Sequence, residues 1–82
     1  MATPLIVGNW KMNLLTADAT GLALCVKEFV EEITDVRVVL APSFTLLHSV
    51  NNVLFGSKVG LASQNFYFEK KGAYTGEISP DM

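Results

Sequence analysis

The chain has 82 residues, half of them hydrophobic and 17% charged, with a formal net charge of −2. At this length it forms one small domain at most, and its charge offers no basic block that would suit a nucleic-acid or membrane surface. The mean hydropathy of +0.35 is high for so short a chain and indicates apolar surface that other polypeptide would cover.

The sequence carries no visible targeting or redox signal. Its first residues lack a basic region, and no stretch approaches the roughly 20 apolar residues of a membrane span. Cys25 is the only cysteine, so it forms no internal disulfide and joins no metal cluster. Its position within an apolar helical face predicts a small packed side chain, and a reducing cytoplasm is the expected location.

Residues 4–10 predict a first strand. Its start, Pro-Leu-Ile-Val, has no polar side chain and is typical of a strand buried on both faces of a parallel sheet. Because side chains alternate along a strand, we expect Asn9 and Lys11 to share one face and Trp10 to take the other. A cation and an amide would then lie together at the carboxyl end, where α/β folds bind ligands. The alternative is that Lys11 merely extends its ammonium into solvent.

Residues 16–33 predict a helix. Thr16 suits the N-cap, and Asp18 suits the positive end of the helix dipole. Apolar residues at helical spacing are expected to face the core; they are Leu22, Val26, Phe29 and Ile33, widened by Ala19, Ala23 and Val30.

Residues 36–41 predict a second strand buried on both faces, and residues 43–54 a second helix that Ser43 could cap. His48 falls on the polar face of this helix. No carboxylate or nucleophile is spaced to orient it, so we interpret it as a surface residue and not as a catalytic one.

A third strand is predicted over residues 58–64, after a turn in which Gly56 suits a helix C-cap. Small residues and Gln64 share one face of this strand, which suits close packing in a tightly curved sheet. The resulting β-α-β-α-β order predicts an α/β fold with a parallel sheet and right-handed crossovers.

Residues 65–78 fit neither the helical nor the strand period. They hold four aromatic side chains, and Gly72 and Gly76 bracket the tip. A long aromatic loop of this kind most simply inserts into another chain or another part of the same chain. Residues 79–82, Ser-Pro-Asp-Met, predict the start of a helix, so we expect the chain to be the amino-terminal part of something larger.

Most common catalytic arrangements are missing from the sequence. It has no glycine-rich phosphate loop, no serine–histidine–acid set and no histidine pair for a metal. What remains at the predicted strand ends is Asn9, Lys11 and Gln64. These side chains can bind and polarise an anionic substrate, but none is a credible general base at neutral pH.

Several segments together resemble the triosephosphate isomerase family. They are residues 9–13 (Asn-Trp-Lys-Met-Asn), 41–43 (Ala-Pro-Ser), 64–65 (Gln-Asn) and 72–79 (Gly-Ala-Tyr-Thr-Gly-Glu-Ile-Ser). The resemblance runs through the whole chain in order and implies the first third of an eight-stranded (β/α)8 TIM barrel of about 250 residues. It therefore implies interconversion of dihydroxyacetone phosphate and D-glyceraldehyde 3-phosphate through an enediol(ate), in glycolysis and gluconeogenesis, with no cofactor and no metal.

The resemblance also implies roles for single residues. Lys11 matches the lysine that attracts the substrate phosphate and stabilises the transition state, and Asn9 matches the asparagine that holds the substrate oxygens and that lysine. Thr75 matches a loop threonine that reaches into the second subunit of a homodimer. The other positions matching the second layer of the site or the dimer interface are Gln64, Gly76, Glu77, Met12, Phe44 and Tyr74.

The proton-transfer part of that family's site has no counterpart here. In this family, a standard example of active-site pKa tuning, a glutamate base and a neutral histidine move the proton beneath a closing loop. Those residues match no position up to Met82, so the 82-residue segment alone is predicted to be inactive. The alternatives are a non-catalytic interaction or complementation module that works through residues 65–78, and a free-standing phosphate-binding unit.

Overall fold

The structure, a computed structural model, describes residues 2–82 and contains one parallel sheet. Its three strands lie in the order β1-β2-β3, with β1 at Leu5–Asn9, β2 at Arg37–Ala41 and β3 at Gly60–Leu61. Register places Val7 beside Val39, and Val39 beside Gly60. The predicted parallel β-α-β-α-β arrangement is confirmed.

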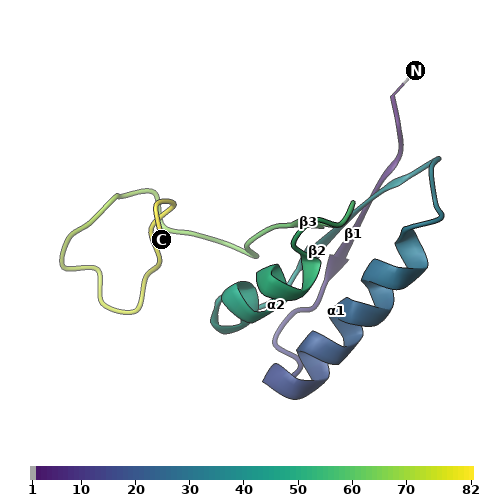
Figure 1. The fold of residues 1–82 in the computed structure, drawn as a ribbon. Helices are drawn as coiled ribbons and strands as arrows, with labels where there is room; N and C mark the ends of the chain where they lie inside the picture. The colour runs from purple at the N-terminus through teal and green to yellow at the C-terminus, as the bar shows by residue number, and fades with distance from the viewer. Residues whose placement is uncertain (1) are drawn as a thin grey trace.

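Two helical connections join the strands. Helix α1 spans Thr16–Val30, and a short 3-10 helix, η1, at Phe44–Leu46 leads into helix α2 at Leu47–Leu54. Figure 1 shows both helices on one side of the sheet, as successive crossovers of a single hand require. Neither helix in the described part of the chain is long and apolar enough to cross a membrane.

The core lies between the helices and the sheet. Ala19 and Ala23 of α1 are fully buried, as is Val50 of α2, because small side chains let these two helices and the sheet approach closely. Trp10 is partly buried and packs against this core. Gly8 leaves room for Leu40, because a Cβ there would lie only 3.1 Å from a methyl of that side chain.

The face of α1 that meets the core is narrower than the predicted one. Leu22 and Phe29 are 42% and 75% exposed, and Cys25 is exposed too. The buried line runs through Ala19, Ala23 and Val30, which the prediction included, and Val26 packs against it. A helix turns about 100° per residue, so Cys25 lies about 200° from Ala23. The prediction that Cys25 is packed is therefore wrong. Leu22 and Phe29 lie outside this line because close packing on α2 selects the small side chains.

Strand β1 is much less covered than predicted. Leu5, Ile6 and Val7 are each more than half exposed, although the sequence predicts burial on both faces. The reason is geometric: β1 is an edge strand and both helices lie on one side of the sheet. The exposed apolar residues provide a surface for further polypeptide.

The predicted ends of the elements are partly correct. Hydrogen bonds from Arg37 N to the Pro4 carbonyl and from Trp10 N to the Ala41 carbonyl carry the β1–β2 pairing close to the predicted limits. The third strand is only two residues long instead of seven, because within the described chain β3 pairs with β2 alone and β2 ends at Ala41. Helix α1 stops at Val30, three residues early.

The predicted caps also change. Thr16 is the first residue of α1 and not its cap, and the Leu15 that precedes it makes no side-chain cap bond. Ser43 precedes η1, but its hydroxyl lies 3.2 Å from that of Thr45 and caps no backbone N–H. Gly56 has φ +79°, which suits its predicted place after α2.

Residues 79–82, the predicted start of a helix, form one turn. Met82 N donates to the Ser79 carbonyl over 3.2 Å. The Ser79 hydroxyl is buried, with no hydrogen-bond partner among the residues that the structure describes.

Candidate active site

The candidate site begins where β1 ends. Asn9 is the last residue of the strand, and its Oδ1 accepts a hydrogen bond of 2.9 Å from the main-chain N–H of Lys11. Lys11 has φ +56°, in the left-handed region that residues with a Cβ rarely adopt. The alternation of side chains along β1 therefore stops before Lys11, so alternation does not explain why Asn9 and Lys11 lie together. A side-chain to main-chain hydrogen bond is the reason.

Gln64 ties this turn to the rest of the sheet. Its Nε2 donates to the carbonyl of Lys11 over 2.8 Å and to that of Ala41 over 2.9 Å. The Ala41 carbonyl also accepts from Trp10 N over 3.1 Å. One amide thus joins the segment after β3 to the ends of β1 and β2, and brings Gln64 together with Asn9 and Lys11.

The sequence interpretation missed a further contact. The Nδ2 of Asn13 donates to the Trp10 carbonyl over 2.9 Å. The available signal was chemical: asparagine side chains commonly bond to backbone groups a few residues away. Leu14 follows with φ +77°, a second left-handed residue in the same turn.

The chemistry that this end of the sheet offers is the binding of an anion. Lys11 is exposed and carries an ammonium, and Asn9 is exposed with its Oδ1 already engaged, which leaves its amide N–H groups facing solvent. A cation beside an amide donor suits phosphate or a developing oxyanion. Within residues 2–82 no group of three or more His, Cys, Asp or Glu could hold a metal ion. His48 is exposed, as predicted.

The loop of residues 65–78 has an internal structure. Tyr67 N donates to the Ile78 carbonyl over 2.7 Å and closes its base. The Tyr67 ring packs against those of Phe68 and Tyr74 in tilted arrangements, each with a centroid distance of 4.6 Å. Such a compact loop with close ends and its own packed side chains is an Ω-loop.

Thr75 occupies a defined place in this loop. Glu77 N donates to the Tyr74 carbonyl over 3.0 Å, so Thr75 and Gly76 are the central residues of a β-turn. Gly76 has φ +86°, which a type II turn requires at its third position. The glycine therefore follows the threonine for a backbone reason, and the turn leaves Thr75, Gly76 and Glu77 exposed.

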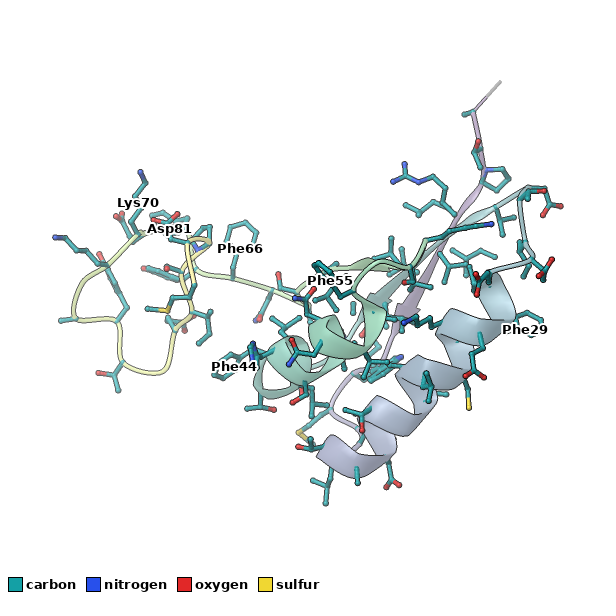
Figure 2. All side chains as sticks on the ribbon, in the orientation of Figure 1. Phe29, Phe44, Phe55, Phe66, Lys70 and Asp81 are labelled. Atoms are coloured by element: carbon teal, nitrogen blue, oxygen red, sulfur yellow. The ribbon has the colours of Figure 1, made fainter. Side chains whose placement is uncertain are left out.

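The remaining predicted residues are not all brought together. Figure 1 shows the loop extending away from the sheet, so within one chain its tip does not reach the end of β1. Phe44 is 54% exposed and borders a hollow of about 300 Å³ with Phe66 and Ile78 of its own chain; Figure 2 shows Phe44 and Phe66 on facing segments. Met12, at 94% exposure, is not part of that hollow.

Comparison with known proteins identifies the family. The family model described as triosephosphate isomerase matches residues 4–82. The chain belongs to the triosephosphate isomerase family. It is 43% identical over 82 residues to the triosephosphate isomerase of Endomicrobium trichonymphae, and 45% identical over 80 residues to that of Pelobacter propionicus.

A solved structure supports the fold assignment. The triosephosphate isomerase of Bartonella henselae superposes with a TM-score of 0.78 at 30% identity, over 94% of this chain and 31% of that one. The chain covers 33% and 32% of the two relatives, so it spans about a third of their length. The sheet and helices described above are thus the first part of a TIM barrel, and the open edges and face of the sheet lie where a barrel continues.

Proposed function

We propose that this chain supplies the electrostatic part of a triosephosphate isomerase site, in a barrel that interconverts dihydroxyacetone phosphate and D-glyceraldehyde 3-phosphate. Lys11 attracts the phosphate and stabilises the enediolate, and Asn9 donates to substrate oxygens. The proton-transfer groups belong to the other two thirds of the barrel. The reaction serves glycolysis and gluconeogenesis in the cytoplasm and uses no cofactor.

The observation that carries this proposal is the arrangement at the strand ends. Asn9 and Gln64 hold the backbone on both sides of the Lys11 Cα, with hydrogen bonds of 2.9 Å to its N–H and 2.8 Å to its carbonyl. A group that merely reaches solvent needs no such fixation. A group that stabilises a transition state does, because preorganised charge costs no reorganisation when the reaction occurs.

The proposal includes a homodimer. The Ω-loop presents Thr75 at the tip of a turn, and Tyr74 and Phe68 remain 44% and 73% exposed within one chain. Exposed aromatic side chains on a self-supported loop suit insertion into a second subunit. We assign Thr75 and Glu77 to that contact, and Met12 and Phe44 to the surface that receives it.

Activity of a completed barrel tests the proposal. We define the chimeric barrel as residues 1–82 of this chain joined to the remaining two thirds of the Endomicrobium trichonymphae triosephosphate isomerase. Isomerase activity is expected, and Lys11→Ala should lower kcat/KM by about 100-fold or more, because transition-state charge loses its partner. A coupled assay of glyceraldehyde 3-phosphate formation measures both proteins.

Lys27→Ala is the matched control for this experiment. Lys27 lies in the last turn of α1, on a different part of the molecule from Lys11, and its loss should leave kcat/KM within about twofold. Equal activity of the Lys11→Ala and parent chimeras would refute the proposal.

The exposed aromatic loop favours one other function, that of a non-catalytic module which completes another protein through residues 65–78. In that case the chimeric barrel assembles and folds, but its activity does not depend on Lys11. The same pair of variants therefore separates the two functions.

A further inference from the structure

The geometry points to Asn13 as a positioning residue for Lys11, an inference that rests on the function proposed for Lys11. Its side chain donates from Nδ2 to the Trp10 carbonyl over 2.9 Å. That carbonyl belongs to the peptide unit whose N–H is the N–H of Lys11. Asn13 thus holds the same peptide that Asn9 holds from the opposite end, over 2.9 Å to Lys11 N.

The two bonds fix a torsion that would otherwise relax. The φ angle of Lys11 is the rotation between the Trp10–Lys11 peptide and the Lys11 Cα, and it stands at +56°. The free energy of an L-residue falls when it leaves this region, because its Cβ crowds the backbone there. Asn9 and Asn13 anchor the peptide on one side of the Cα, and Gln64 anchors the Lys11 carbonyl on the other.

Every main-chain polar group from Trp10 N to Lys11 O is consequently occupied. Trp10 N donates to Ala41 O, and the other three groups bond to the side chains of Asn9, Asn13 and Gln64. Local strain of this kind persists only where the surroundings over-determine it. The direction of the Lys11 Cα–Cβ bond, and hence the point from which its ammonium reaches, is set by these three amides.

Asn13 has no competing structural role in the contacts of the described residues. It is exposed, its one hydrogen bond runs back to Trp10, and it caps no N–H of α1, whose first residue is Thr16. Its loss therefore removes a restraint on Lys11 without opening the core.

The experiment uses the chimeric barrel and two variants without an Nδ2 donor. Asn13→Ala and Asn13→Asp should each lower kcat/KM about 10-fold or more, as expected for a displaced catalytic group. Because Asn13→Ala adds no charge, a loss of activity in that variant cannot be caused by repulsion between a new carboxylate and the substrate phosphate. Both should keep the midpoint of thermal unfolding within about 4 °C of the parent, because only one exposed hydrogen bond is lost.

A rescue variant and a matched control complete the design. Asn13→His keeps an N–H donor at the δ position in its Nδ1-protonated tautomer and should recover kcat/KM to within about threefold of the parent. Asn52→Ala, the same substitution at an exposed position on α2, should leave kcat/KM unchanged and keep the unfolding midpoint within the same range of about 4 °C.

The outcomes separate this inference from the proposed function. If Lys11→Ala inactivates the barrel while Asn13→Ala keeps parental kcat/KM, the function stands and the positioning role is wrong. If the Asn13 variants lose folding but keep kcat/KM per folded molecule, Asn13 has only a structural role. If Asn13→His does not recover activity, the hydrogen-bond donor is not what positions Lys11. If Lys11→Ala retains full activity, the function itself fails.

Discussion

At the scale of single residues, the site depends on amide side chains that bond to the backbone. Gln64 donates from one nitrogen to two carbonyls, those of Lys11 and Ala41. Only an amide N–H₂ at that distance from the main chain supplies two donors in this way. A carboxylate has the same shape and none of the donors.

Gln64→Glu should therefore destabilise the chimeric barrel by about 1–3 kcal/mol, because a carboxylate would face two carbonyl oxygens without a proton to share. Urea unfolding measures the change. Glu69→Gln, the reverse exchange at an exposed loop position, is the control and should stay within about 0.5 kcal/mol. Equal stability of the Gln64→Glu variant and the parent would mean that the two hydrogen bonds contribute nothing.

At the scale of the elements, backbone conformation decides what each glycine does. Gly21 lies inside α1 and Gly56 follows α2, and a Cβ added at either would meet no atom within 4 Å. Their φ angles differ: Gly56 stands at +79°, while Gly21 is helical. Steric space is thus equal at the two sites, and only the torsion separates them.

The same substitution should consequently have opposite effects. Gly21→Ala is expected to stabilise the chimeric barrel by about 0.5–1 kcal/mol, since alanine loses less backbone entropy in a helix. Gly56→Ala should destabilise it by about 1 kcal/mol, because the left-handed region disfavours a Cβ. Thermal unfolding of both variants measures the pair, and shifts of the same sign would contradict the argument.

At the scale of the whole molecule, the 82 residues leave too much surface open. The accessible area is 6236 Å² for 8.9 kDa, whereas a compact monomer of that mass exposes about 4,800 Å². The radius of gyration of 14.0 Å likewise exceeds the value of about 11.7 Å for a compact chain of this length. Figure 1 shows the cause: the loop stands away from a sheet that is covered on one side.

Residues 1–82 alone should accordingly show no isomerase activity and no sharp cooperative unfolding in urea. Mixing them with the separately produced remaining two thirds of the Endomicrobium protein should restore a cooperative transition, because the open face and edges of the sheet are then covered. Circular dichroism and the isomerase assay follow both. If the isolated segment unfolds in a steep urea transition that does not change on mixing, its sheet does not need to be covered by the rest of the barrel.

Residue chemistry by itself determined the parallel β-α-β-α-β order and the grouping of Asn9, Lys11 and Gln64 at one end of the sheet. These follow from local signals: apolar strands, helical spacing and the rule that parallel strands share a carboxyl end. The turns at Gly56 and Gly76 could also be predicted from the sequence, because glycine favours the positive φ angles that both residues adopt.

Tertiary structure alone decided the features that depend on neighbours. Packing against α2 excluded Phe29 and Leu22 from the core face of α1 and kept Ala19 and Ala23. Strand β3 is short because β2, its pairing partner, ends at Ala41. The left-handed turn at Lys11 persists because hydrogen bonds from the Asn13 and Gln64 amides outweigh the steric cost of the positive φ angle. Sequence periodicity reports the preference of each segment, whereas these outcomes are set by free energies shared between segments.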